Sequence, residues 1–540
     1  MNGRDIRICT IFAFAKMEFM EKLHPIMFAG TGSDVGKSII AAAFCRIFKQ
    51  DGYQPAPFKA QNMALNSFAT PEGLEIGRAQ AVQAEAAGVP CHTDMNPLLL
   101  KPQSDHTSQV VLNGRPIGNR NAYDYFRKEG RDELRREVCA AYDRLAARYN
   151  PVVLEGAGSI SEINLRDTDL VNLPMALHAG ADVILVGDID RGGVFASVYG
   201  SLMLLRPHER ERIKGILINK FRGDIRLFES GITMLEELCG IPVVGVVPYY
   251  RDIYIEEEDS VALAAKSVRA EKGKVNIAVI LLRHLSNFTD FNVLERDPRV
   301  HLFYTNNVDE LAKADVILLP GSKSTLDDLY ELRRNGVAAA IIADLRWLRQ
   351  SGLEAAILKA ADAGTLVFGI CGGYQMMGQE VLDPEHVEGD IERLPGLGLL
   401  PISTRMSGEK VTRQVKFGLC NPHSPSSTLH SPFMQGYEIH MGVTTPVEGT
   451  PDSPLNLLEN GSTDGYCVDS TCMGTYIHGI LDNPEFIDFL LAPFADKLSG
   501  NAGAFDYHTF KEEQYDRLAE HVRRHVNLPL IYQILTKNHD

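Results

Sequence analysis

Short apolar runs alternate with amphipathic stretches from about residue 24 to about residue 250. Continuous runs of Val, Ile and Leu bounded by Gly or Asp are typical of strands buried on both faces of a sheet. Residues 39–49 instead place their apolar side chains on one stripe at the helical period. Strands separated by helices predict a parallel, doubly wound α/β sheet. The runs that we expect to form its strands are 25–29, 152–154, 183–186, 215–218 and 243–246.

A second series of apolar runs follows a stretch without sustained apolar periodicity. Residues 251–273 are first acidic and then mixed in charge, which is typical of a linker. Runs at 275–282, 316–319, 366–370 and 473–477 predict another α/β sheet, and 505–537 has a helical pattern. We therefore expect an N-terminal extension at 1–21, a first domain at 22–252, a linker at 253–273 and a second domain at 274–540 that ends in a helical segment.

The start of the chain loosely resembles a secretory signal peptide. Residues 8–15 are apolar, follow two arginines and end in Ala-Phe-Ala. The apolar run is at the short end for such signals, and a nucleotide-binding pattern follows almost at once. We interpret residues 1–21 as an overlong start or a frayed extension, with Met17 or Met20 as alternative starts.

Composition narrows the classes of partner. A chain of 540 residues exceeds what one hydrophobic core supports, and two active sites would fit. The net charge of −16 disfavours nucleic acids, because their binding depends on Lys and Arg neutralising phosphates. The nine cysteines include no CxxC pair, which favours a reducing compartment, and no apolar run approaches the roughly 18 residues of a membrane helix. We expect a cytoplasmic protein without nucleic-acid or membrane partners, of unknown oligomeric state.

A glycine-rich sequence, GTGSDVGKS at 30–38, lies between a predicted strand and a predicted helix. In this context glycines let backbone N–H groups point at phosphates, and the helix N-terminus adds positive potential. Lys37 would pair with the β- and γ-phosphates, and Ser38 would bind Mg²⁺. The loop is one residue longer than the common form, since Thr31 stands where the strict spacing has its first glycine. The residues expected at the phosphates of ATP are Gly30, Thr31, Gly32, Ser33, Asp34, Val35, Gly36, Lys37 and Ser38, with Lys59 as a further candidate.

Three polar residues at predicted strand ends complete this hypothesis. Glu155 follows an apolar run at the edge where open α/β sheets bind ligands, so it is a second Mg²⁺ ligand or a solvated strand-end acid. Lys59 could neutralise a transferring phosphoryl group, or be a surface lysine. Asn219 could contact the base, but Asp224 lies one position too far for the GTPase pattern, so adenine is the safer expectation.

A second motif predicts a nucleophile. In GICGGYQ at 369–375, Cys371 lies between small residues at a predicted strand-to-helix turn. Such a turn exposes the nucleophile, and the helix N-terminus stabilises both a thiolate and an oxyanion. The backbone N–H groups of Gly372 and of Gly321, in LPGS at 319–322, are candidates for the oxyanion hole. A thiol also needs a base, and the residues leave two candidates open, His478 in GTYIHG and His440 in GYEIHMG.

Taken together, these motifs resemble the cobyric acid synthase family, the glutamine-hydrolysing amidotransferases of cobalamin biosynthesis. The resemblance extends from about residue 22 to the C-terminus. It is carried by GTGSDVGKS, PFKAQNMALNS, LEGAGS, GDIDRGGVFAS, SNFTDF, LPGSKST, FGICGGYQMMG, GYEIHMG and GTYIHG in this order.

The resemblance implies a dethiobiotin-synthetase-like P-loop domain followed by a class-I-like glutamine amidotransferase domain. Cys371 would be the nucleophile and His478 its base. Most class-I glutaminases have Glu two residues after this His, where the chain has Ile480, so we expect a Cys–His dyad. The reaction implied is amidation of the b, d, e and g carboxylates of adenosyl-cobyrinic acid a,c-diamide, with ATP and glutamine as substrates, Mg²⁺ as cofactor and a corrinoid as the small-molecule partner.

Other functions fit parts of the same pattern. Cobyrinic acid a,c-diamide synthase, or an enzyme that amidates a cell-wall precursor, would share the architecture. A ParA/MinD-like ATPase switch would need only the nucleotide loop, and a scaffold would need neither active site. Cys371 and His478 weigh against the switch and the scaffold.

Overall fold

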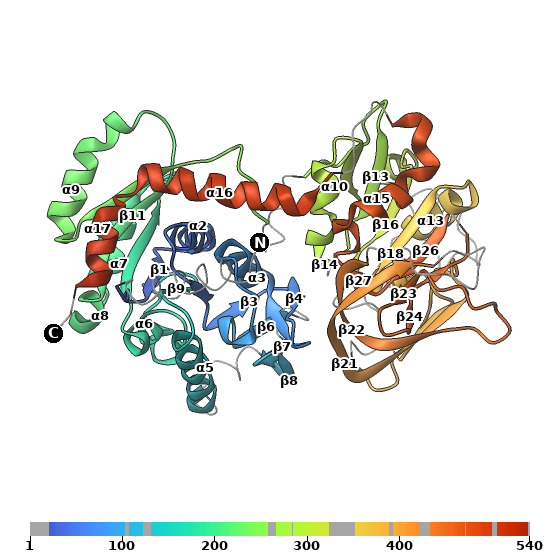
Figure 1. The fold of residues 1–540 in the computed structure, drawn as a ribbon, viewed down its shortest axis with the longest axis horizontal. Helices are drawn as coiled ribbons and strands as arrows, with labels where there is room; N and C mark the ends of the chain where they lie inside the picture. Colours follow the sequence, from blue (N-terminus) through green and yellow to red (C-terminus); the bar gives the residue numbers. More distant parts are fainter. Residues whose placement is uncertain are drawn as a thin grey trace, which may run out of the picture.

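The computed structural model describes most of the chain. The described residues are 21–102, 107–121, 131–256, 266–282, 285–322, 352–387, 392–420, 433–469, 471–498 and 505–537. The predicted N-terminal extension lies almost entirely outside them. Figure 1 shows two lobes side by side, with the C-terminal helices joining them across the top.

The first lobe is built on a six-stranded parallel sheet in the order β12-β11-β10-β1-β9-β2. Its central strands are buried along their whole length, which explains why they read as continuous apolar runs. All five predicted strands are present. The strands are β1 Ile26–Gly30, β2 Ala56–Phe58, β9 Val152–Glu155, β10 Asp182–Asp188, β11 Ile213–Phe221 and β12 Val243–Pro248. The helices of this lobe are α2 Lys37–Gln50, α3 Arg78–Ala87, α5 Arg131–Ala146, α6 Leu173–Ala179, α7 Val194–Met203, α8 Pro207–Arg210 and α9 Glu229–Cys239.

Short strands between β2 and α5 extend this lobe toward the second one. They form a four-stranded sheet, β3-β6-β7-β8, and a two-stranded hairpin, β4–β5. The hairpin contacts β21 and β22 of the second lobe (Figure 1). Their bounds are β3 Gln61–Met63, β4 Ser67–Ala69, β5 Glu75–Gly77, β6 Leu98–Pro102, β7 Thr107–Leu112 and β8 Arg115–Asn121.

The second lobe contains another six-stranded sheet, β15-β13-β16-β18-β26-β25, in which only the last pair is antiparallel. Its strands are β13 Val275–Ile280, β15 Val300–Thr305, β16 Val316–Leu319, β18 Leu366–Ile370, β25 Tyr466–Cys467 and β26 Cys472–Thr475. A short antiparallel pair, β14 Leu285–Ser286 and β17 Gly321–Ser322, lies at its edge. The helices are α10 Asn292–Arg296, α11 Val308–Leu311, α13 Leu353–Asp362, α14 Gly372–Met376 and α15 Pro484–Leu491.

A third, mostly antiparallel sheet packs beside it, and the long strands β21 and β22 form its centre. The single strand predicted at 473–477 is wrong in detail, because β26 ends at Thr475 and β27 begins at Ile477 in this other sheet. Asp464 accepts hydrogen bonds from the Thr475 hydroxyl and the Tyr476 N–H, which hold the chain where it changes sheets. The strands are β19 Glu380–Leu382, β20 Arg393–Pro395, β21 Ile402–Leu419, β22 Met434–Pro446, β23 Asn456–Leu458, β24 Thr463–Asp464 and β27 Ile477–His478.

The C-terminal helices leave the second lobe and pack on the first (Figure 1). Helix α16, Tyr507–His525, contacts α2 and β12, and α17, Leu528–Thr536, contacts β12. Leu518 and Val522 are buried in the same core as α2. Arg46 of α2 pairs with Glu512 and Asp516 of α16. The helical segment at the end of the predicted second domain therefore packs on the first lobe.

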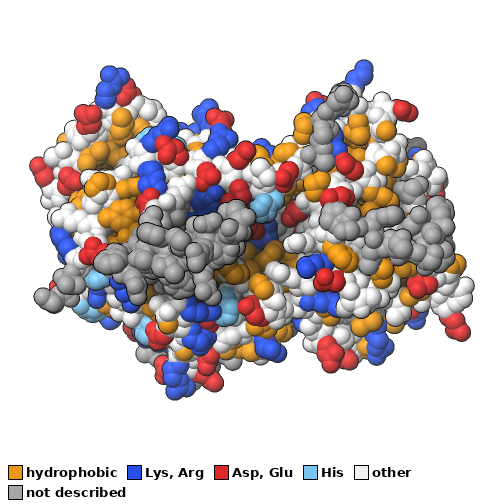
Figure 2. All heavy atoms as spheres, in the orientation of Figure 1, with side chains coloured by type: hydrophobic (Ala, Val, Ile, Leu, Met, Phe, Trp, Pro, Cys, Tyr) orange, Lys and Arg blue, Asp and Glu red, His pale blue; other side chains and the backbone are white. Residues whose placement is uncertain are grey.

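The face of the molecule in Figure 2 is mixed in charge. Figure 2 shows acidic and basic side chains interspersed over the visible face, with apolar side chains between them. Within the described ranges, every helix is too short or too polar to cross a bilayer.

Candidate functional site

The nucleotide-type loop joins β1 to α2 at the carboxyl edge of the first sheet. Asp34 and Gly36 both have left-handed backbone conformations, with φ of 56° and 94°. A side chain at Gly36 would overlap the Asn219 amide, and one at Gly30 would lie 2.8 Å from the Lys37 ammonium. Glycine is therefore required twice, for the turn and for close approach of the lysine.

Lys37 is held inside this loop. Its ammonium donates hydrogen bonds to the carbonyls of Gly32, at 2.9 Å, and Gly158, at 3.0 Å. Burial lowers the pKa of Lys37 to about 8, although the nearby carboxylate of Glu155 opposes this shift. An anion such as a phosphate would offset the cost of burying the ammonium.

Glu155 connects the predicted phosphate site to two neighbouring elements. Its carboxylate, at the end of β9, accepts hydrogen bonds from Ser38 at 2.8 Å and from Lys59 at 2.8 Å. Gln83 of α3 donates to its other oxygen at 2.6 Å. Burial opposes the charged form of Glu155, but the Lys59 ammonium and these hydrogen bonds hold the pKa of the carboxyl below its usual value. Glu155 is thus a buried carboxylate rather than a solvated strand end.

The pair Ser38 and Glu155 fits an octahedral Mg²⁺ ion. Two ligands bound at about 2.1 Å and at right angles lie roughly 3 Å apart, and the two oxygens here are separated by 2.8 Å. In the described parts of the chain there is no cluster of three or more His, Cys, Asp or Glu side chains suited to a metal. Mg²⁺ commonly uses one or two protein oxygens together with phosphates and water.

The other predicted residues surround the loop. The Thr31 N–H donates to Val186, and Ser33 lines a cavity of about 360 Å³ beside the loop. Asn219 donates its amide to the Val35 carbonyl at 2.8 Å and is buried below the loop. Its expected contact with the base stays a prediction. Asp188 ends β10 and pairs with Lys220 at 3.1 Å, a strand-end carboxylate that the sequence analysis did not single out.

Cys371 occupies the turn between β18 and α14. Its backbone has φ 53° and ψ −112°, a strained conformation for a residue with a side chain. The turn packs tightly, because a side chain at Gly373 would overlap the Leu319 carbonyl. The Cys371 N–H donates to the Thr475 carbonyl at 2.8 Å, and the sulfur lies 3.5 Å from the Ile439 carbonyl. The local motif and its structure agree with a nucleophile elbow.

The imidazole of His478 pairs with a carboxylate. Its Nδ1 lies 2.7 Å from Oδ2 of Asp290, and both side chains are buried. Burial would lower the pKa of His478, but the Asp290 carboxylate and the nearby sulfur of Cys371 raise it to about 10. The Gly479 N–H also donates to Asp290, at 3.1 Å.

The structure therefore places a buried carboxylate beside the histidine of the expected Cys–His dyad. Asp290 comes from the 3-10 turn Phe288–Phe291, whereas most class-I glutaminases use Glu two residues after the His. Asp290 lies in the SNFTDF block, but no spacing rule links it to a histidine 188 positions away.

The rival histidine and the oxyanion candidates line the same region. His440 stacks on Tyr476 with ring centroids 3.7 Å apart, and its Nδ1 lies 3.2 Å from the Gly442 carbonyl. His440 also has a carboxylate neighbour, Glu438, but at 3.9 Å, so the 2.7 Å contact with Asp290 favours His478 as the base. Gly372 directly follows Cys371, and a side chain at Gly321 would lie 3.5 Å from Cε1 of His478. Both glycines remain predicted oxyanion donors.

A small cavity of about 40 Å³ joins Cys371 and His478 to residues of both lobes. Lys101 of β6 reaches it from the first lobe, and Lys410 of β21 from the second. The free space would hold only a few water molecules, which is less than the volume of glutamine. The interface between the lobes is therefore one wall of the glutaminase pocket.

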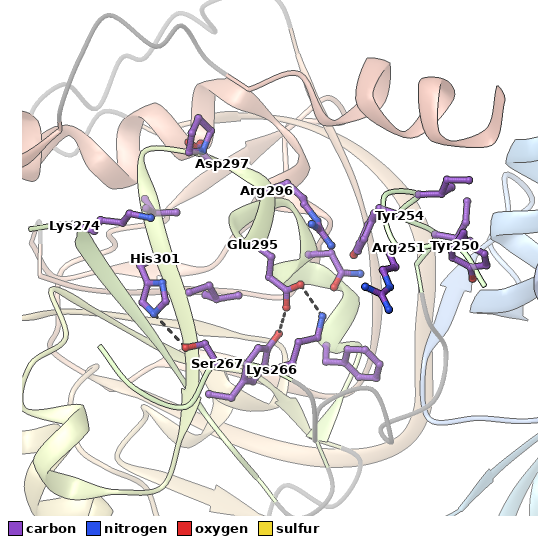
Figure 3. A pocket seen from close by; sticks show the side chains of 18 of the residues that line it. Tyr250, Arg251, Tyr254, Lys266, Ser267, Lys274, Glu295, Arg296, Asp297 and His301 are labelled. Atoms are coloured by element: carbon purple, nitrogen blue, oxygen red, sulfur yellow. Dashed lines mark hydrogen bonds and ion pairs between the residues drawn. The ribbon is translucent and has the colours of Figure 1, made fainter. Parts of the chain in front are cut away.

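Another cavity lies away from both motifs. It has a volume of about 720 Å³ and lies between residues 249–255, α10 and β15. Figure 3 shows Lys266 paired with Glu295, and Arg251 and Tyr254 on the same wall. Neither Cys371 nor Lys37 lines it. Size alone does not connect this cavity with the chemistry.

Two family models match the chain in the order of the two lobes. Residues 26–261 match the CobQ/CobB/MinD/ParA nucleotide binding domain, and residues 276–346 and 341–486 match the CobB/CobQ-like glutamine amidotransferase domain. The fold and its sites thus define a glutamine amidotransferase fused to a P-loop nucleotide-binding domain.

Curated relatives narrow this class. Proteins named cobyric acid synthase from Bacteroides fragilis and Phocaeicola vulgatus are 77% and 71% identical, each over 96% of this chain and 99% of the relative. One from Parabacteroides distasonis is 59% identical over 95% of this chain and 99% of the relative. The chain belongs to the cobyric acid synthase family. A solved structure of PurLQS from Thermotoga maritima covers 46% of this chain and 99% of its own, at 17% identity and a TM-score of 0.27, too weak to bear on the fold.

Proposed function

We propose that this enzyme uses ATP and glutamine to amidate the b, d, e and g carboxylates of adenosyl-cobyrinic acid a,c-diamide, which gives adenosyl-cobyric acid. The observation that carries the proposal is that one chain of this family contains two sites. One is a glycine-rich loop that holds the buried Lys37, and the other is the Cys371–His478–Asp290 constellation. The first site would activate an acid, and the second would supply ammonia.

Activation of the acid belongs to the first lobe. A carboxylate resists attack by ammonia because oxide is a very poor leaving group. The substrate carboxylate would therefore attack the γ-phosphorus of ATP, which releases ADP and forms an acyl phosphate. Lys37 and Lys59 would face the phosphates. Mg²⁺ held by Ser38 and Glu155 would neutralise phosphate charge when bound.

Release of ammonia belongs to the second lobe. The Cys371 thiolate would attack the glutamine carboxamide, and His478 would give a proton to the departing ammonia. Water would then hydrolyse the glutamyl thioester, with His478 accepting its proton, and glutamate would leave. Asp290 would hold the imidazole in position, and the N–H groups of Gly372 and Gly321 would stabilise the oxyanion. Ammonia would attack the acyl phosphate and expel phosphate.

The acid would enter the cavity of about 360 Å³ beside the phosphate loop. Ser33 and Gly158 connect it to the loop, and the partly exposed Met63 and Leu165 give it apolar lining. A corrinoid is much larger than this cavity, so one edge of the macrocycle would enter at a time. We therefore expect four separate amidations, with the corrinoid released or rotated between them.

The two half-reactions can be separated by substitution. Cys371→Ser should abolish glutamine-driven synthesis but leave synthesis from added ammonia, whereas Lys37→Ala should remove both. Amide formation is measured on the corrinoid, with glutamine or an ammonium salt as the nitrogen source. Glutamine-driven turnover by Cys371→Ser would overturn the assignment of the nucleophile.

A further inference from the structure

Two buried lysines from different lobes share one carboxylate. Lys101 of β6 lies 2.6 Å from Oε1 of Glu75, and Lys410 of β21 pairs with Oε2 of the same residue. Glu75 is on β5, so two of the three residues belong to the first lobe. Each lysine side chain is only 6% exposed and that of Glu75 is fully buried. We call these three residues the interlobe cluster.

The interlobe cluster borders the glutaminase cavity. Lys101 and Lys410 line this cavity together with Cys371 and His478. Lys101 also donates to the Ser67 hydroxyl at 2.9 Å, and the Ser67 N–H donates to Asn287, beside His478, at 3.0 Å. The first lobe is thus connected by hydrogen bonds to the edge of the proposed active site.

The charges of this cluster do not balance. Two ammonium groups face one carboxylate, and the ion pairs of the described residues give neither lysine a second acidic partner. Burial and the neighbouring Lys101 lower the pKa of Lys410, while Glu75 opposes that shift. A buried excess cation is costly unless an anion joins it.

We infer that Lys101 and Lys410 bind the α-carboxylate of glutamine, so that the first lobe supplies part of the glutaminase site. This inference rests on the proposed function. Glutamine carries its α-carboxylate at the end opposite the carboxamide that Cys371 attacks, and the lysines line the same cavity as the thiol. A carboxylate there completes a cluster of two cations and two anions. Glutamine hydrolysis then requires the two lobes to be docked.

The rival role for these lysines is electrostatic support of the Cys371 thiolate, whose charge acts on Lys410. Substrates that lack one polar group separate the two roles. 4-Aminobutanamide has the carboxamide and the amino group of glutamine but no α-carboxylate. Glutaramic acid has the carboxamide and a carboxylate but no amino group. If the lysines instead support the thiolate, their substitution should lower kcat/KM for glutamine and for both analogues alike.

The test measures ammonia release by the full-length protein with Mg-ATP and corrinoid present. Lys410→Met and Lys101→Met should each lower kcat/KM for glutamine and glutaramic acid by about 10- to 100-fold, the size expected for a charge-assisted hydrogen bond. For 4-aminobutanamide, which the wild type should use poorly, the same variants should change kcat/KM less than threefold. Lys416→Met is the matched control, since Lys416 lies on the same strand, is exposed and pairs with Glu459; it should match the wild type.

Synthesis from added ammonia checks that the lysine variants fold, because ammonia bypasses the glutaminase. Removal of one lysine still leaves a neutral Lys–Glu pair, so folding should survive. Equal losses of kcat/KM on all three substrates, or no loss on glutamine, would overturn the inference that these lysines bind the α-carboxylate. Hydrolysis that does not need Cys371 would instead overturn the proposed function, and the Cys371→Ser protein is assayed alongside to separate the two failures.

Discussion

Both proposed sites contain buried charged groups. Glu155 is surrounded by donors from Ser38, Lys59 and Gln83, and Asp290 fixes the imidazole of His478. Such groups are expensive to bury, which is why perturbed pKa values gather at functional sites. The charges of Asp290 and Lys37 can each be tested by a single substitution.

Asp290 should act as a positioning residue. Asp290→Asn removes the negative charge that helps to raise the pKa of His478 to about 10. We expect the glutaminase kcat to fall by about 10²- to 10⁴-fold, as for an Asp-to-Asn change beside a catalytic histidine. The alkaline limb of the pH profile should move to lower pH, which a purely structural role would not cause.

The control for this change is Asp309→Asn at an exposed position of the same lobe. It should leave both the rate and the pH profile unchanged. A profile for Asp290→Asn that matches the wild type would show that Asp290 does not act on His478.

Lys37 should destabilise the nucleotide-free protein. Its pKa in the folded protein is about 8, below the ordinary 10.5. The free-energy cost of burying its ammonium is therefore fully present below pH 8 and is lost as the pH rises to 10.5. Lys37→Met should therefore raise the free energy of unfolding at pH 7 by about 1–3 kcal/mol, and the gain should vanish near pH 10.5.

Urea unfolding from pH 7 to 10.5 measures this effect, with exposed Lys272→Met as the control. A Lys37→Met protein that is less stable than the wild type at pH 7 would contradict the account.

Site residues within a local sequence motif could be predicted, whereas their contacts from distant parts of the chain could not. The loop residues and Cys371 were predicted because their chemistry is tied to turns within a few residues. Asp290, Gln83 and Lys101 reach their sites from other elements, and no sequence spacing records those contacts.

At the scale of elements, burial decides which predictions succeed. Strands buried on both faces, such as β10 and β18, appear in the sequence as continuous apolar runs and lie close to the predicted positions. The short strands β3 to β8 and the long pair β21 and β22 were not predicted. Strands β3, β21 and β22 mix buried with exposed positions, whereas β5 and β6 are almost fully buried but only three and five residues long.

Helix α16 was predicted as helical, but its packing on the first lobe was not. Leu518 is 1% exposed in the core that contains α2. Leu518→Ala should lower the free energy of unfolding by about 2–5 kcal/mol, the cost of lost burial and a residual cavity. Urea unfolding measures it, and the exposed Glu513→Ala on the same helix should change stability by less than about 0.5 kcal/mol. Equal effects of the two substitutions would mean that α16 does not stabilise the first lobe.

At the scale of the molecule, the two lobes are held by contacts from several elements. The C-terminal helices pack on the first sheet, Glu256 of the predicted linker accepts hydrogen bonds from Arg78 of α3 and Tyr507 of α16, and the interlobe cluster joins β5 and β6 to β21. The order of the two domains could be predicted from the sequence because each carries its own motif. Their interface could not, because it depends on single polar residues scattered over the chain.

We propose that one chain couples glutamine hydrolysis to ATP-driven amidation of a corrinoid. The most direct measurement incubates the purified protein with Mg-ATP, glutamine and adenosyl-cobyrinic acid a,c-diamide and follows the corrinoid by mass spectrometry. We predict four successive replacements of a hydroxyl by an amino group, each dependent on both ATP and glutamine. An unchanged corrinoid mass while glutamine is hydrolysed would contradict the claim and would point to a different acid as the substrate.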